Sequence, residues 1–80
     1  MDTEGNTAAI RRNLGLRIRD LREGQGLSQY KFSAMVGIER TYLIDVEKGR
    51  RNVAIDNLIK ISQGLGVELS YLFKDVDRPA

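Results

Sequence analysis

Apolar residues recur along this chain at intervals of three and four positions, the spacing that places side chains on one face of an α-helix. The longest stripe contains Ile10, Leu14, Ile18 and Leu21. Shorter inward-facing stripes follow at Phe32, Met35 and Val36, at Leu43 and Val46, and at Leu58, Ile61 and Leu65, and a last segment offers Leu69, Leu72 and Phe73. No segment alternates apolar and polar residues as a half-buried strand would. The pattern predicts an all-α fold of five short helices in one bundle.

Two residues mark the boundaries of a helix pair in the middle of the chain. Ser28 can accept backbone N–H bonds at a helix start, and Gly37 can take the positive φ that ends a helix. They predict a helix over residues 29–36, a tight turn, and a second helix over about residues 39–48. The outward face of that second helix is polar and basic, as in a helix that enters the major groove of DNA. The pair is therefore typical of a helix-turn-helix that binds a specific DNA sequence.

The same signals divide the chain into three parts. Residues 1–9 are small and polar without a periodic apolar pattern, and we expect a flexible N-terminal segment there. Residues 10–76 hold the helix-turn-helix domain, whose first helix is expected to end near residues 24–26. Residues 77–80 are expected to form a C-terminal tail.

Charge adds to this picture because it is unevenly distributed. The chain of 80 residues has a formal net charge of +2, but residues 10–64 contain 11 Lys or Arg and 6 Asp or Glu, a balance of +5. This basic part coincides with the helix pair and favours a polyanionic partner, with a solvated basic surface as the alternative. A domain this small buries only about 60% of its unfolded surface, so a dimer would supplement its stability.

The residue types that the chain lacks exclude several functions. It has neither Cys nor His, and so no thiolate nucleophile, no imidazole base and none of the usual zinc ligands. We therefore predict no enzyme activity, no metal and no cofactor. No apolar run approaches the roughly 20 residues that cross a bilayer, and residues 1–4 lack the regions of a signal peptide. The expected location is the cytoplasm.

A longer series of positions carries a resemblance to a known family. The positions are Leu14-Gly15, Arg17-Ile18-Arg19, Leu21-Arg22, Gly26-Leu27-Ser28-Gln29, Gly37-Ile38, Glu47-Lys48-Gly49, Arg51-Asn52, Leu58, Ile61, Leu65-Gly66-Val67 and Leu72-Phe73. Through them the chain resembles the lambda-repressor-like, or Xre-type, helix-turn-helix family, which implies a compact five-helix DNA-binding domain. Within the family, the chain is most similar to the controller proteins of restriction-modification systems, at Arg40-Thr41-Tyr42-Leu43 and Arg50-Arg51-Asn52.

Two places depart from the family pattern. Val53 and Ala54 stand where the family often has Pro and then Ser or Thr, so the fourth helix lacks its usual cap. Glu39 stands where Ser, Thr or Asp often begins the recognition helix. Its carboxylate favours the helix dipole but repels nearby phosphate.

The resemblance implies which residues would meet the bases of DNA. Arg40 and Thr41, at the exposed start of the third helix, are the expected base contacts. Arg40 could donate twice to guanine, and Thr41 could touch a thymine methyl group or a polar base edge. Asp45, one turn further, could accept from cytosine or pair with a neighbouring side chain inside the protein.

The resemblance also implies contacts to the DNA backbone. Gln29, the first residue of the second helix, is expected to meet a phosphate, with an ordinary solvated role as the alternative. Arg50, Arg51 and Asn52 could grip the sugar-phosphate chain, and Arg51 would also hold its loop. The Tyr42 hydroxyl could bond a phosphate, or its ring could cover the edge of the core.

Two further sets of residues receive structural roles. The family pairs the positions of Arg22 and Glu47 in a partly buried salt bridge, which would fix the reading helix. One short helix reads few base pairs, so we expect a twofold dimer whose half-sites lie about 34 to 36 Å apart. The apolar residues expected at its interface, unless some of them complete the monomer core, are Ile59, Leu69, Tyr71 and Val76.

These expectations describe a homodimeric transcriptional regulator that binds an inverted-repeat operator in double-stranded DNA. Control of a restriction-modification system is its most specific form, and RNA polymerase is a further partner to test. The alternative is an antitoxin or another protein-interaction module with the same fold. In that alternative Arg40 and Thr41 would be dispensable, and the apolar surface of the last helix would be essential.

Overall fold

The structure, a computed structural model, describes the backbone of residues 3–78 and the side chains of residues 6–78. It contains five helices and no strand in this part of the chain. The helices are α1 (Thr3–Gly24), α2 (Gln29–Val36), α3 (Arg40–Glu47), α4 (Ile55–Leu65) and α5 (Leu69–Phe73). The prediction of an all-α, five-helix domain is confirmed.

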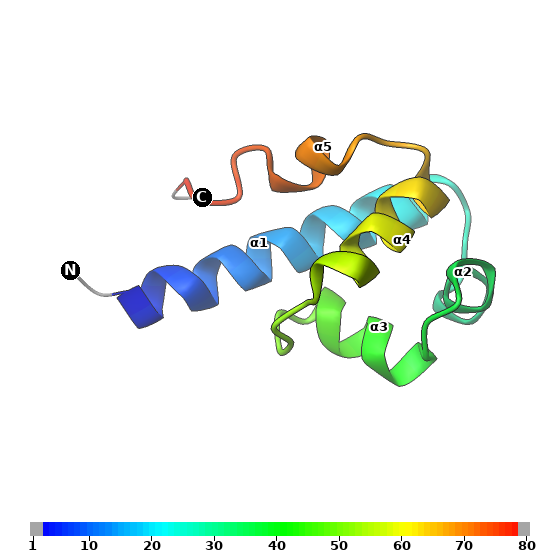
Figure 1. Cartoon of the computed structure of the whole chain (residues 1–80), viewed down its shortest axis with the longest axis horizontal. Coiled ribbons are helices and arrows are strands. Elements are labelled where there is room, and N and C mark those ends of the chain that lie inside the picture. The colour runs from blue at the N-terminus through cyan, green and yellow to red at the C-terminus, as the bar shows by residue number, and fades with distance from the viewer. Residues whose placement is uncertain (1–2, 79–80) are drawn as a thin grey trace.

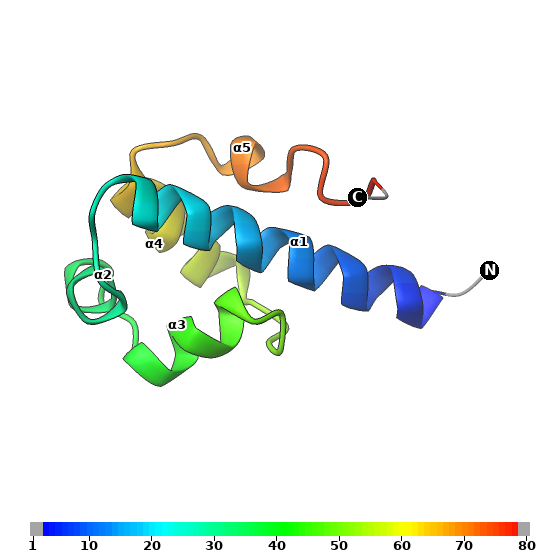
Figure 2. The same cartoon turned by 180° about the vertical axis from the view of Figure 1, so that it is seen from behind.

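Helix α1 forms the long axis of the molecule, which measures 39 × 21 × 20 Å (Figure 1). Helix α5 lies along one side of α1, and α3 lies on the other side. Helix α4 lies over α1 between α5 and α3, and α2 packs on α3 and α4 at the end opposite the N-terminus. The reverse view shows the same order with α1 in front (Figure 2).

The core lies between α1 and the four shorter helices. Its buried residues are Leu14, Ile18, Phe32, Leu43, Val46, Leu58, Ile61, Leu65, Leu72 and Val76. Ile10 and Leu21 pack partly buried against this core, so all four members of the α1 stripe point toward it. The helical spacing of apolar residues thus predicts most of the core.

The cap residues act as the sequence predicts. The Ser28 side chain accepts a hydrogen bond from the Lys31 N–H at 3.0 Å, and Gly37 closes α2 with a φ of 75°. Helix α4 begins after Ala54, which provides no side-chain cap, and Glu39 provides none for α3. Both departures from the family pattern therefore leave a helix start without a side-chain acceptor.

The start of α1 differs from the expectation. The helix begins at Thr3 rather than near Ile10, and its first turns project beyond the other helices (Figure 1). None of the described side chains from Asn6 to Ala9 is fully buried, so these turns leave no apolar stripe in the sequence. The division of the chain at residue 10 and the flexibility of the segment before it stay predictions. Residues 1–2 and 79–80 lie outside the described residues.

The inward placement of Met35 is wrong. Its side chain is 56% exposed, whereas Phe32 is fully buried and Val36 is half-buried. Phe32 and Val36 are four residues apart and share one face of α2, and only that face packs against the core. Met35 lies to the side of it and faces solvent.

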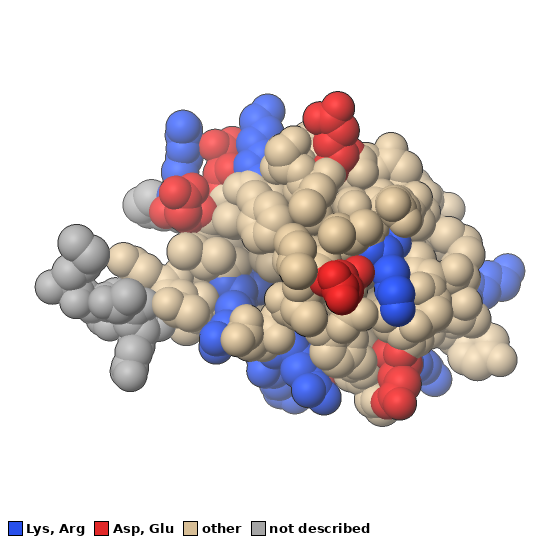
Figure 3. All heavy atoms as spheres, viewed as in Figure 1, with Lys and Arg blue, Asp and Glu red and all other residues tan. Residues whose placement is uncertain are grey.

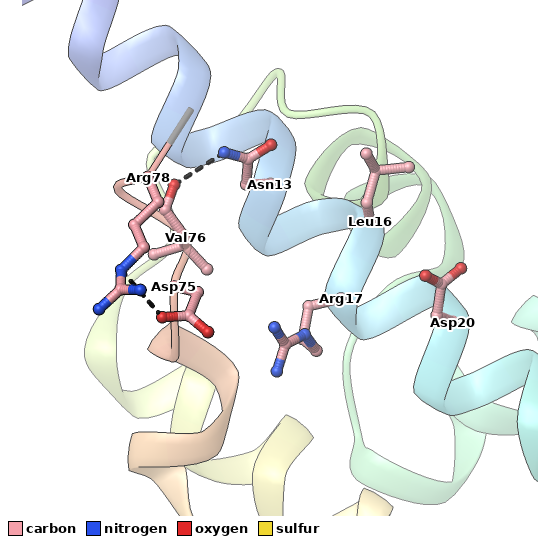
Figure 4. Close-up of a pocket in the computed structure, with 7 residues that line it drawn as sticks. All are labelled: Asn13, Leu16, Arg17, Asp20, Asp75, Val76 and Arg78. Carbon is pink, nitrogen blue, oxygen red and sulfur yellow. Dashed lines mark hydrogen bonds and ion pairs between the residues drawn. The ribbon is translucent and has the colours of Figure 1, made fainter. Parts of the chain in front are cut away.

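Side chains of α1 hold the segment that follows α5. The Asn13 amide donates to the Val76 carbonyl at 2.8 Å, as Figure 4 shows. The Arg17 guanidinium donates to the carbonyls of Tyr71 and Lys74 at 3.1 and 2.9 Å, and its Cζ atom lies 5.0 Å from the centre of the Tyr71 ring. These bonds draw the segment onto α1 and place Val76, which is 6% exposed, in the core.

No helix in the part of the chain that the structure describes combines the length and the apolar character required to cross a membrane.

Candidate DNA interface

The turn between α2 and α3 is built on the backbone of Ser33. Its carbonyl accepts from the N–H groups of both Gly37 and Ile38 at 3.0 Å. The Ser33 hydroxyl donates to the Tyr30 carbonyl at 3.0 Å, and the small side chain is 4% exposed. This turn brings α3 out at a fixed angle to α2, which is the arrangement of a helix-turn-helix.

Arg40 and Thr41 occupy the first turn of α3, and both are exposed. Neither side chain has a hydrogen bond or an ion pair with any residue that the structure describes. Leu43 and Val46 point from the opposite face of α3 into the core. The two residues predicted to touch bases therefore lie together on the outer face of the helix with their polar groups available.

A buried ion pair fixes the other end of α3. Arg22 Nε lies 2.6 Å from Glu47 Oε2, Arg22 Nη2 donates to Glu47 Oε1 at 2.9 Å, and both residues are 6% exposed. Arg22 Nη1 donates to the Leu27 carbonyl at 2.7 Å. The hydrogen bond to Glu47 raises the pKa of Arg22 and outweighs the opposing effect of burial. The salt bridge expected between these two positions is thus present, and it ties α3 to α1 and to the segment before α2.

Gln29 joins the same network. Its Nε2 atom donates to Glu47 Oε1 at 3.0 Å, a bond that the sequence did not suggest. The bond orients the first residue of α2 and leaves its second amide proton and its carbonyl oxygen for another partner. In the predicted phosphate contact, the Gln29 amide would keep its bond to Glu47 and donate its second proton to the phosphate.

The end of α3 carries a second, exposed cluster. Arg51 Nε lies 3.7 Å from Asp45 Oδ2, and the Arg51 guanidinium lies 5.0 Å from the centre of the Tyr42 ring. Asp45 therefore pairs with Arg51 of its own chain, one of the two roles that its position allowed. Tyr42 is half-buried at the core edge. The side chains of Arg50 and Asn52 are exposed and have no hydrogen-bond or ion-pair partner among the described residues, whereas the Arg50 backbone N–H donates to the Asp45 carbonyl at 2.9 Å.

The residues expected at a dimer interface do not share one environment. Ile59 and Tyr71 are exposed, Leu69 is half-buried, and Val76 is buried within its own chain. Val76 thus completes the monomer core, the alternative role that the sequence left open for these residues. On the same two helices, Ile55 on α4 and Phe73 on α5 are also exposed, and sequence reasoning missed them. Phe73 belongs to an apolar series, and only the packing shows that Leu72 takes the core position.

The charges gather unevenly on the surface. Figure 3 shows several basic side chains together at the lower edge of the molecule, on the side where the α3–α4 connection lies in Figure 1. Acidic and basic side chains alternate at the opposite edge, near α5. Among the described residues, no three His, Cys, Asp or Glu side chains come together as metal ligands would. The concentrated positive charge favours an extended anion such as DNA.

Comparison with known proteins agrees with this geometry. The helix-turn-helix family HTH_3 matches residues 18–72. The control protein C.MunI from Mycoplasma sp is 44% identical over 70 residues, which cover 86% of this chain and 95% of the relative. The control protein C.BamHI from Bacillus amyloliquefaciens is 41% identical over 63 residues, which cover 78% of each chain.

A solved structure shows the same arrangement of helices. The crystal structure of the restriction-modification controller protein C.AhdI from Aeromonas hydrophila superposes with a TM-score of 0.76 at 39% identity. The superposition covers 78% of this chain and 94% of C.AhdI. With its cap residues, its buried Arg22–Glu47 pair and its exposed α3 face, the chain belongs to the lambda-repressor-like (Xre-type, HTH_3) helix-turn-helix family, in which it is similar to the controller proteins of restriction-modification systems.

Proposed function

We propose that this protein is a transcriptional regulator that binds a specific DNA sequence as a homodimer and controls a restriction-modification system. One observation carries the proposal: Arg40 and Thr41 are exposed and unpartnered at the start of α3, the end of which is held by a buried ion pair. A rigid helix that presents free hydrogen-bonding groups can discriminate between base pairs in the major groove. The names of C.MunI, C.BamHI and C.AhdI support the control function.

The two ends of the helix-turn-helix would divide the contacts with DNA. Arg40 and Thr41 would enter the major groove and read base edges. The backbone N–H groups at the start of α2 and the free half of the Gln29 amide would bind a phosphate on one side. The loop after α3 would bind the sugar-phosphate chain on the other side through Arg50, Arg51 and Asn52, with Tyr42 supporting Arg51.

Asp45 has a different place in this scheme. Its carboxylate pairs with Arg51, so it would orient a cation toward the DNA backbone instead of meeting a phosphate itself. A contact between Asp45 and cytosine would use the oxygen that Arg51 leaves open. The pair at 3.7 Å is half-exposed, so rearranging it would cost little energy.

The proposed dimer brings together exposed apolar residues of α4 and α5. Ile59, Leu69 and Tyr71 remain in this interface, and the exposed Ile55 and Phe73 join it. A twofold axis would place two α3 helices about 34 to 36 Å apart, one turn of DNA, so the operator would be an inverted repeat. Since the proposed ligand is DNA, we place the site of action in the cytoplasm, and RNA polymerase is a proposed secondary partner.

Selection of bound sequences from a pool of random DNA duplexes tests this function. We expect an enriched inverted repeat whose half-site centres are one helical turn apart, and retained preference for it as the salt concentration rises. Absence of enrichment, or binding that weakens equally for all sequences with salt, would contradict the proposal and favour the protein-interaction module. A methyltransferase gene and an endonuclease gene beside this one would support the restriction-modification role.

A further inference from the structure

The N-terminal half of α1 is a feature that the helix-turn-helix itself does not require. The family match begins at residue 18, whereas α1 begins at Thr3. The first turns of the helix continue past the rest of the domain (Figure 2). Two consecutive arginines, Arg11 and Arg12, lie on this part of α1. Neither has a role in the core, because Ile10 and Leu14 supply the apolar contacts there.

The loop after the recognition helix runs directly against this part of α1. A Cβ atom added at Gly49 would lie 2.8 Å from the Arg12 Cα atom and 2.9 Å from its Cγ atom. Gly49 also has a φ of 74°, so the absence of a side chain lets the loop both turn and approach α1. Arg12 is exposed beside this contact. Its guanidinium can therefore extend from α1 alongside the loop.

Arg11 approaches the same loop from a neighbouring position. It lines one surface hollow together with Arg51 and Asn52, two of the residues proposed to contact the DNA backbone. The floor of this hollow is apolar, with Leu14 and Leu58 among its lining residues. The basic face of α1 is thus continuous with the loop.

The charges in this area do not balance within the protein. Arg11, Arg12, Arg50 and Arg51 gather around the loop, and Asp45 is the one carboxylate paired with any of them in the described part of the chain. Like charges gathered around one loop repel one another, and a neighbouring polyanion offsets that repulsion. A row of phosphates supplies such an anion, because duplex DNA carries about one negative charge per 1.7 Å of its axis.

We infer that Arg11 and Arg12 extend the phosphate-binding surface of the α3–α4 loop onto α1, so that each protomer neutralises more of the DNA backbone than its helix-turn-helix alone. The inference rests on the proposed DNA-binding function. The ligand is the phosphodiester backbone of duplex DNA, which is recognised by charge and not by base sequence. These arginines therefore add affinity and salt dependence without changing which operator is preferred.

The test is the salt dependence of binding by Arg12→Ala and Arg11→Ala on the selected operator and on a random duplex. Each phosphate contact contributes about 0.9 to the slope of the logarithm of affinity against the logarithm of salt concentration. We expect each variant to lower that slope by about this amount per protomer and to weaken both duplexes by the same factor. Arg12→Lys should restore the slope, because a lysine also neutralises a phosphate.

Arg78→Ala is the matched control, because it removes the same charge at a distance from the loop. Arg78 is exposed and pairs with Asp75 at 3.2 Å in the segment after α5 (Figure 4). An equal slope change in Arg78→Ala would overturn the inference in favour of a general effect of net charge, and an unchanged slope in both α1 variants would overturn it directly. If the wild-type protein prefers an operator while the α1 variants behave normally, only this inference fails. If the wild type binds no DNA, the proposed function fails with it.

Discussion

Arg22 and Glu47 form a two-point ion pair that joins α1 to the last residue of the recognition helix. Two nitrogen–oxygen contacts of 2.6 and 2.9 Å hold the planar groups together, and the third Arg22 contact reaches the Leu27 carbonyl. The Gln29 amide occupies a further position on the carboxylate. In the described part of the chain, no buried side-chain nitrogen or oxygen lacks a hydrogen-bond partner. The pair therefore sets the angle at which α3 leaves the domain.

Removal of the Glu47 carboxylate should destabilise the protein strongly. In Glu47→Ala the Arg22 guanidinium stays buried with only the Leu27 carbonyl and the half-exposed Glu23 carboxylate, 3.8 Å from Arg22 Nη2, as partners, so we expect a loss of about 3 to 5 kcal/mol in the free energy of unfolding. Urea denaturation followed by circular dichroism measures it. Glu23→Ala is the control: the half-exposed Glu23 pairs with Arg19 at 3.3 Å and with Arg22 only at 3.8 Å, and its loss should cost less than about 1 kcal/mol. Equal effects of the two substitutions would refute a special role for the buried pair.

The arginine of this pair should give the protein no pH-dependent stability near neutrality. The pKa of Arg22 is raised in the folded state by its bond to Glu47. A group whose pKa rises on folding contributes its full stabilisation below its unfolded pKa and loses it only as the pH climbs through the folded value. For an arginine that loss falls in strongly alkaline solution. We expect the difference in stability between the wild type and the double variant Arg22→Met/Glu47→Gln, which leaves no unpaired buried carboxylate to titrate, to stay constant from about pH 6 to 9; a steady change across that range would count against this assignment.

Gly15 allows α1 and the end of α3 to touch through their backbones. A Cβ atom at this position would collide with the Val46 carbonyl oxygen and lie 2.6 Å from that of Glu47. Gly15→Ala should therefore push α3 away from α1 and lower the melting temperature, although alanine favours a helix. Gly24→Ala provides the comparison, since its Cβ would meet nothing within 4 Å at the end of the same helix. It should leave the melting temperature unchanged or slightly higher, and similar results for both glycines would disprove the steric explanation.

Periodicity could predict what faces the core but not what extends beyond it. Leu14 and Ile18 were identifiable because a buried helix face repeats every three to four residues. The helical turns that begin at Thr3 bury no described residue completely and so leave no such repeat. Val76 follows α5 with no helix of its own, and its burial depends on the Asn13 bond to its carbonyl, which joins positions 63 residues apart.

In the candidate DNA interface, too, regular spacing predicts some features and not others. The exposed start of α3 could be predicted, since its caps and its apolar positions fix which face of the helix turns outward. The stacking of Arg51 on Tyr42 and the bond from Gln29 to Glu47 could not, because each joins side chains on different turns or helices with no regular spacing. Family resemblance supplied the Arg22–Glu47 pair in advance, and periodicity alone would not have found it.

Arg40 and Arg50 should differ in what they contribute to DNA binding. Arg40→Ala should cost about 1 to 3 kcal/mol on the selected operator and much less on random DNA, because it removes contacts to a base edge. Arg50→Ala should weaken both duplexes similarly and lower the salt slope by about one unit, because it removes a phosphate contact. Fluorescence anisotropy at several salt concentrations separates the two patterns. Equal losses on both duplexes for Arg40→Ala would make Arg40 a backbone contact instead.

Ile59 and Val76 provide a test that separates the dimer from the monomer core. Ile59 is 39% exposed on α4, so Ile59→Asp should leave each subunit folded while a charge enters the proposed interface. Sedimentation velocity should then show monomers at concentrations where the wild type is dimeric. Val76 is buried, so Val76→Ala should lower the free energy of unfolding by about 1 to 3 kcal/mol and leave the dimer intact. A dimeric Ile59→Asp protein would move the interface away from α4. Since a monomer reads only one half-site, the same variant should also lose its preference for the inverted repeat over a single half-site.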